Sequence, residues 1–194
     1  MDIIAHGLWT AALYAAINKK RMRQKKARLP VLRAAVWGIF PDLFAFTLPW
    51  TFIIIGLLRS DIHPANIPGP DSIEPPAPDA FPSSIFNLAT SLYNISHSAL
   101  VFAAVIFIVW LIRKRIPWEM GGWLFHIAID IPTHSTTFFP TPVAWPLSGW
   151  TFPYGIPWHK PWFFALNYAA LLALFIFLRY TGKSPSKSSA KTQG

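Results

Sequence analysis

Long apolar runs, separated by short polar or basic segments, dominate the pattern of this chain. The runs cover residues 3–17, 31–58, 85–112, 118–139 and 162–180. Most of them approach the roughly 20 residues that an α-helix needs to cross the hydrocarbon core of a membrane. We therefore predict an all-α fold, a multi-pass transmembrane helical bundle with about five spans. Pro41 and Pro49 lie inside the second run and predict a kinked or broken second helix.

Composition favours a membrane protein over a soluble one. Hydrophobic residues make up 53% of the 194 residues and charged residues only 13%, whereas soluble domains usually carry about 25% charged residues. The 10 Trp and 16 Phe are of the type that gathers where lipid meets water. The chain has no Cys, which excludes disulfides, thiolate metal sites and cysteine nucleophiles. Any metal ion would have to be bound through nitrogen and oxygen atoms.

Basic residues are concentrated in a block at 19–33, in a cluster at 113–115 and in the C-terminal tail. Because Lys and Arg favour cytoplasmic loops, all three should lie inside. Five crossings then place the N-terminus outside and the C-terminus in the cytoplasm, in a bacterial inner (plasma) membrane. The net charge of +9 needs no nucleic acid to explain it. Binding of anionic lipid or of a cytoplasmic partner is the alternative role of the block.

A single integral-membrane domain over residues 1–181 accounts for this organisation. Residues 59–84 are rich in Pro and carry several acidic side chains, so they predict an extended outer loop. Residues 182–194 are rich in Ser and Lys and predict a disordered tail. No internal repeat is evident along the chain.

Six ionisable residues interrupt the apolar runs where a bilayer should exclude them. They are His6, Asp42, His97, His126, Asp130 and His134. Burying such a group without a partner is costly, so an intramembrane charge predicts a functional site. At about 1.5 Å per residue, four of these groups lie about 15–23 Å from the basic end of their run. Similar depths predict that the groups meet, and a metal ion would be a suitable partner.

The spacing of the last three residues adds to this prediction. His126 and Asp130 are four residues apart, so both side chains lie on one helix face and can bind the same ion. His134 extends this face by four more residues. Pro132 should distort that turn, and His134 would then begin a loop at the mouth of the site.

Each group also has a simpler interpretation. A single His in a helix is more often a hydrogen-bonded core residue than a ligand. Asp42 follows Pro41 and could cap a helix where the chain is broken. His126 and Asp130 could form a buried hydrogen-bonded pair. Several such groups in lipid-depth segments together favour a polar functional centre.

Four short motifs resemble, in order and spacing over most of residues 1–150, a bacterial membrane-bound family of metal-dependent hydrolases, which includes a LexA-regulated inner-membrane protein. The motifs are His6-Gly7, Phe40-Pro41-Asp42-Leu43, Ser96-His97-Ser98, and Phe125-His126-Ile127-Ala128-Ile129-Asp130 continuing to Thr133-His134. The resemblance implies a set of metal ligands. They are His6, Asp42, His97, His126 and Asp130.

The ligand order is also similar, more distantly, to part of that in zinc-dependent phospholipases C and single-strand nucleases. This chain departs from both patterns. Phe44 stands where relatives often have a second Asp or His, and Ser96 replaces Thr. The HxxxE helix of the soluble enzymes is absent from the sequence. The expected number of ions is therefore one to three, of zinc or another divalent metal.

These ligands predict a hydrolase in which a metal-activated water attacks a phosphoester or lipid substrate drawn from the bilayer. His134 would be the catalytic proton donor to the leaving group. Two alternatives stay open. Intramembrane His and Asp residues on broken helices also build proton or divalent-cation pathways, although the lack of repeats argues mildly against transport. A non-catalytic scaffold could instead hold a structural metal.

Overall fold

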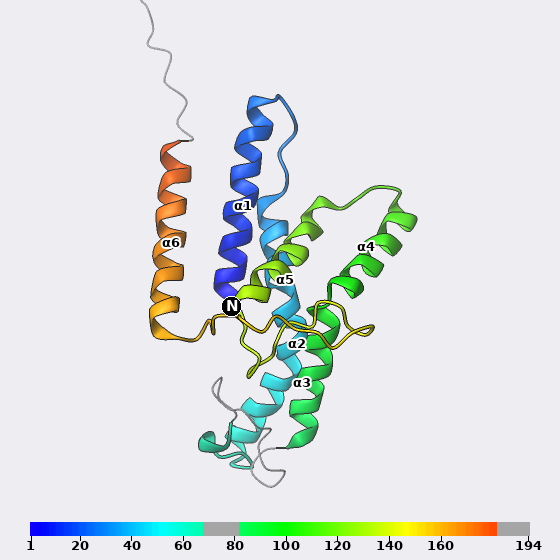
Figure 1. The fold of residues 1–194 in the computed structure, drawn as a ribbon, viewed down its shortest axis with the longest axis vertical. Coiled ribbons are helices and arrows are strands. Elements are labelled where there is room, and N and C mark those ends of the chain that lie inside the picture. The colour runs from blue at the N-terminus through cyan, green and yellow to red at the C-terminus, as the bar shows by residue number, and fades with distance from the viewer. Residues whose placement is uncertain (68–81, 182–194) are drawn as a thin grey trace, which may run out of the picture.

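The computed structural model describes residues 1–67 and 82–181. Within these ranges the chain forms six α-helices and two short 3-10 helices, and no β-strand is found there (Figure 1). The α-helices are α1 (Ile3–Arg23), α2 (Val31–Leu58), α3 (Ser83–Ser96), α4 (Ala99–Arg113), α5 (Gly121–Thr133) and α6 (Pro161–Tyr180), and the 3-10 helices are η1 (Pro64–Asn66) and η2 (Trp118–Met120). The predicted all-α class is confirmed.

Two helices, α2 and α6, are long and apolar enough to cross a membrane. Helices α3 and α4 pass the same test together but are bent by 58° at the break between them, which gives three candidate spans if the pair counts as one. Helix α5 has only 13 residues, or about 20 Å, against about 30 Å for the hydrocarbon core. Helix α1 ends in a basic turn. The fold is thus that of a membrane protein, but five spans are not confirmed.

The predicted break in the second helix is wrong. Helix α2 runs without interruption through Pro41 and Pro49, both of which are buried. A Pro inside a helix removes one backbone hydrogen bond, but neighbouring helices can stabilise the segment around it. Helix α2 is surrounded in this way, because it packs against α1, α3 and α5. The break lies instead in the third apolar run, between Ser96 and Ala99.

Hydrogen bonds satisfy the polar groups that this break frees. The Ser98 hydroxyl caps α4 by accepting from two N–H groups of its first turn, at 3.2 and 3.3 Å. The same hydroxyl donates to the carbonyl of Trp145 at 2.6 Å. The indole N–H of Trp123 donates to the carbonyl of Ser96, also at 2.6 Å. Non-helical backbone at membrane depth is tolerated where protein buries it, so this segment can bend around its central residue.

Replacing Ser98 with Ala should lower the free energy of unfolding by about 1–2 kcal/mol, because both the cap and the bond to Trp145 are lost. The measurement is the midpoint of thermal unfolding in detergent. The control is Ser91→Ala, which makes the same change on the exposed side of α3. Equal midpoints for the two variants would contradict the proposed role of Ser98.

The two basic segments that the structure describes, residues 19–33 and 113–115, lie at one end of the molecule. Figure 1 shows the C-terminal end of α1, the connection between α4 and α5, and the C-terminal end of α6 at that end. The segment that follows α2 lies at the opposite end (Figure 1). This is the arrangement that the predicted topology requires, while its direction in a membrane stays a prediction. Residues 68–81 of the predicted outer loop and the tail at 182–194 lie outside the described residues.

Two glycines let α1 and α5 approach α2 closely. A Cβ atom added at Gly38 would lie 2.3 Å from the hydroxyl oxygen of Thr10 on α1. A Cβ atom added at Gly122 on α5 would lie 2.1 Å from the carbonyl oxygen of Ala34 on α2. Small residues at helix crossings are typical of membrane bundles, because they allow the backbones to come together. These crossings bring α1 and α5 to the same stretch of α2.

Candidate metal centre

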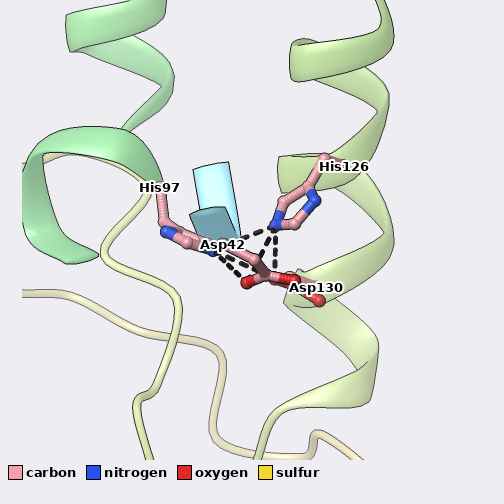
Figure 2. Close-up of side chains that lie close together, drawn as sticks. All are labelled: Asp42, His97, His126 and Asp130. Carbon is pink, nitrogen blue, oxygen red and sulfur yellow. Dashed lines mark hydrogen bonds and ion pairs between the residues drawn. The ribbon is translucent and has the colours of Figure 1, made fainter. Parts of the chain in front are cut away.

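Four of the predicted polar residues meet inside the bundle. Asp42 comes from α2, His97 from the break between α3 and α4, and His126 and Asp130 from α5 (Figure 2). One ligand-type atom of each lies within 4.8 Å of the others, and all four residues are buried. Figure 2 shows the side chains pointing towards one another. The structure therefore brings together groups that lie up to 88 positions apart in the chain, Asp42 and Asp130.

The Asp130 carboxylate lies between two groups of histidines. Its Oδ2 atom is 3.2 Å from Nε2 of His126 and 3.5 Å from Nε2 of His97. Its Oδ1 atom is 3.0 Å from Nε2 of His6 and 3.3 Å from Nε2 of His134. All six residues singled out in the sequence are therefore neighbours, because Asp130 contacts the four histidines and Asp42 contacts two of them. We call Asp42, His97 and His126 the first half-site, and His6 and His134 the second half-site.

Backbone carbonyl groups fix the orientation of three of the rings. The Nδ1 atoms pair with carbonyl oxygens as follows: His126 with Gly38 at 2.7 Å, His97 with Tyr93 at 3.2 Å, and His134 with Phe139 at 2.9 Å. A carbonyl oxygen only accepts, so Nδ1 carries the proton in His126 and His134. Nδ1 of His97 also lies 2.9 Å from the hydroxyl of Ser96, which can accept from this atom or donate to it. The Nε2 atom of a neutral ring then presents a lone pair to the carboxylates. Metal-binding histidines are typically held in this way.

The first half-site and Oδ2 of Asp130 consequently face one another as acceptors, whereas Oδ1 of Asp130 accepts from other groups. The Nε2 atoms of His97 and His126 are 3.0 Å apart, and neither neutral ring can donate to the other when both carry their proton on Nδ1. Oδ1 of Asp42 lies 3.4 and 3.7 Å from the same two atoms. Two carboxylates and two lone pairs that face one another in a buried site need a positive charge among them.

Several of these atoms have no hydrogen-bond partner. They include Oδ2 of Asp42, Oδ2 of Asp130 and both ring nitrogens of His6. Nε2 of His6 is close to Asp130, but the contact does not have the direction of a hydrogen bond. The His6 ring stacks on the His126 ring, with the centroids 3.6 Å apart. Unpaired buried polar atoms are uncommon in folded proteins, so orphaned ligand-type atoms around one carboxylate fit a bound cation.

A positive charge already contacts the second half-site. The amino nitrogen of Met1 lies 2.6 Å from Oδ1 of Asp130 and 2.9 Å from Nε2 of His134. An ammonium group only donates, so both of its partners act as acceptors. His134 of the second half-site therefore presents the lone pair of its Nε2 atom to a cation.

The structure decides two local questions that the sequence left open. Asp42 is not a helix cap, because α2 continues through it. His134 follows the end of α5 in an extended conformation, so it begins a loop. That loop returns to the helix end, where the N–H groups of Ile156 and Trp158 donate to carbonyls of its last turn at 2.8 and 3.1 Å. His134 thus keeps its place beside Asp130 although the helix has ended.

Sequence reasoning missed the groups that hold the ligands. The carbonyls of Gly38 and Phe139 orient two rings, but a backbone carbonyl gives no signal in residue type. Tyr93 was missed as well: it is 1% exposed, and its ring stacks on that of His97 with centroids 3.7 Å apart. Tyr93 precedes His97 by four positions, so helical spacing was the available signal.

Comparison with family models, curated proteins and solved structures finds no match for this chain. The resemblance to bacterial membrane-bound metal-dependent hydrolases therefore stays a prediction from short motifs. The candidate metal centre stands on its geometry: a buried cluster of Asp42, His97, His126 and Asp130 that could hold an ion.

Proposed function

We propose that this protein is a membrane-embedded, metal-dependent hydrolase. The observation that carries the proposal is the buried set of facing acceptors formed by Asp130 and the first half-site. Two imidazoles and two carboxylates suit Zn²⁺ in donor type and number. His6 and Oδ1 of Asp130 would contribute to a second ion, which would take the place of the Met1 ammonium beside Oδ1, with Asp130 as the shared carboxylate.

A bound zinc ion would supply a hydroxide nucleophile, because it lowers the pKa of its water from 15.7 to about 7. Adjacent half-sites joined by one carboxylate favour a phosphoester as substrate, since two-ion centres stabilise both the attacking and the leaving oxygen. His134 would donate a proton to the leaving group. Its Nδ1–H donates to the Phe139 carbonyl, so a second proton at Nε2, in place of the contact with the Met1 ammonium, would be directed into the site.

The first experiment measures metal content and turnover together. We expect detergent-purified protein to contain at least one zinc ion per chain by elemental mass spectrometry. It should hydrolyse bis(p-nitrophenyl) phosphate or a phospholipid in mixed micelles, lose this activity to a chelator and regain it with zinc. The variant His126→Ala/Asp130→Ala should lose both properties. The matched control is Asp61→Ala/His63→Ala, which removes the same residue types at exposed positions.

The competing functions give different results in the same preparation. A protein with no metal after zinc is resupplied would overturn the metal centre. Metal without turnover, accompanied by zinc or proton flux in proteoliposomes, would indicate an ion pathway. Metal with neither turnover nor flux would indicate a structural role. With the basic end in the cytoplasm of a bacterial inner membrane, the site would open towards the outer face, and block 19–33 would be free to bind anionic lipid.

A further inference from the structure

A cavity of about 720 Å³ extends from the candidate metal centre between α2, α3 and the first residues of the chain. Asp42 and His134 form part of its wall. Much of the remaining wall is apolar and includes Phe46, Pro49, Ile53, Ile85, Phe86 and Ala89. We propose that this cavity binds the hydrocarbon chain of a membrane lipid whose phosphoester lies against Asp42 and His134. The inference rests on the proposed function and adds the class of substrate.

The polar groups of the cavity are arranged as an amphiphile requires. Oδ2 of Asp42 has no hydrogen-bond partner, although the residue is only 5% exposed. Asp2 also lines the wall, but its carboxylate accepts from the N–H of Ala5 at 3.0 Å and from the hydroxyl of Tyr168 at 2.8 Å. Unpaired polarity is therefore found at the metal centre, and the rest of the cavity favours hydrocarbon over water.

The size and position of the cavity agree with this occupant. Small-molecule sites usually have volumes of about 300–1,000 Å³. The volume of this cavity lies within that range, so it has room for one hydrocarbon chain. The wall formed by α2 belongs to a candidate span, and the outer side of the same stretch exposes Leu48, Phe52 and Ile54. Apolar side chains on both sides of one helix segment place the cavity within reach of the bilayer. The proposed occupant would therefore come from the bilayer rather than from water.

Chain length is the variable that tests this inference. We expect butyl-, octyl- and dodecylphosphonate, which resist hydrolysis, to compete with tritiated dodecylphosphonate on zinc-loaded protein in an amphipathic polymer. Each buried methylene should raise the affinity about fourfold, which corresponds to about 0.8 kcal/mol, until the cavity is full. Equal affinities for the three compounds, or no binding to zinc-loaded protein, would overturn the inference.

A substitution that fills the cavity should remove this dependence. Ala89 is buried in the wall, so Ala89→Trp should weaken dodecylphosphonate binding about tenfold or more while butylphosphonate binding and zinc content stay unchanged. The matched control Ala103→Trp adds the same side chain to the exposed side of α4 and should change none of these values. Equal losses in both variants would also overturn the inference. If the wild type contained zinc and hydrolysed its substrate but showed no chain-length dependence, the proposed function would be supported. Only the inference that the cavity binds a lipid chain would be overturned.

Discussion

Asp130→Asn should remove bound metal and hydrolytic activity together, although the new side chain has nearly the same size. The reason is that one carboxylate serves both half-sites: Oδ2 faces His126 and Oδ1 faces His6. An amide has no negative charge and only one acceptor oxygen. We expect the apparent zinc affinity to fall by more than about 100-fold, beyond the 10–100-fold typical of partners outside the ligand shell.

The comparison with a second carboxylate makes this prediction specific. Asp42 contacts the two histidines of the first half-site. Its contact with the second half-site is long, with 4.0 Å between Oδ2 and Nε2 of His6. Asp42→Asn should therefore weaken zinc binding less than Asp130→Asn. Asp61→Asn, at an exposed position, should not change it. Titration of metal-free protein with zinc gives all three affinities, and an unchanged affinity in Asp130→Asn would refute the shared role of this carboxylate.

Gly122→Ala should damage the metal centre although Gly122 contributes no ligand to it. The added Cβ would lie 2.1 Å from the carbonyl oxygen of Ala34 and 3.0 Å from the backbone nitrogen of Gly38. Backbone atoms cannot move aside as a flexible side chain can, so α5 must shift away from α2. That shift would lengthen the 2.7 Å contact between the Gly38 carbonyl and His126. Overpacking of this kind typically costs about 1–3 kcal/mol.

The expected readouts are a lower midpoint of thermal unfolding and a zinc affinity reduced by about 10–100-fold, the range seen when a partner of a metal ligand is disturbed. The control is Gly149→Ala, because a Cβ atom at Gly149 would meet nothing within 4 Å. If Gly122→Ala lowered the midpoint but kept full zinc affinity, helix spacing would not control the centre. An unchanged midpoint would contradict the packing argument itself.

The parts of the site that follow from helical periodicity could be predicted from the sequence. His126 and Asp130 are four residues apart, and side chains at this spacing are neighbours on any α-helix. In the structure Nε2 of His126 lies 3.2 Å from Oδ2 of Asp130. The predicted common depth of His6, Asp42 and His97 also reflects simple geometry, since a helix rises by a constant distance per residue. These residues are surrounded in the sequence by hydrophobic residues, so each of them stood out as a polar interruption of an apolar run.

Features that depend on neighbouring elements could not be predicted in this way. Pro41 suggested a break, yet packing against three helices keeps α2 continuous. The real break is at His97, where Ser98 and the carbonyl of Trp145 replace the lost helical hydrogen bonds. The sequence could not reveal that partnership, because 47 positions separate the two residues. The short length of α5 depends in the same way on a returning loop around residue 156.

The candidate ligands are distributed over α1, α2, the α3–α4 break and α5. Membrane helices are generally inserted first and pack against one another afterwards. The full set of ligands does not exist before that second stage, because α5 contributes only His126 and Asp130 and the other members lie on other segments. Loading of the proposed metal centre would therefore be a late step of maturation, and the energy of binding would stabilise the assembled helices. A cell would have to deliver the ion to a protein that is already in the membrane.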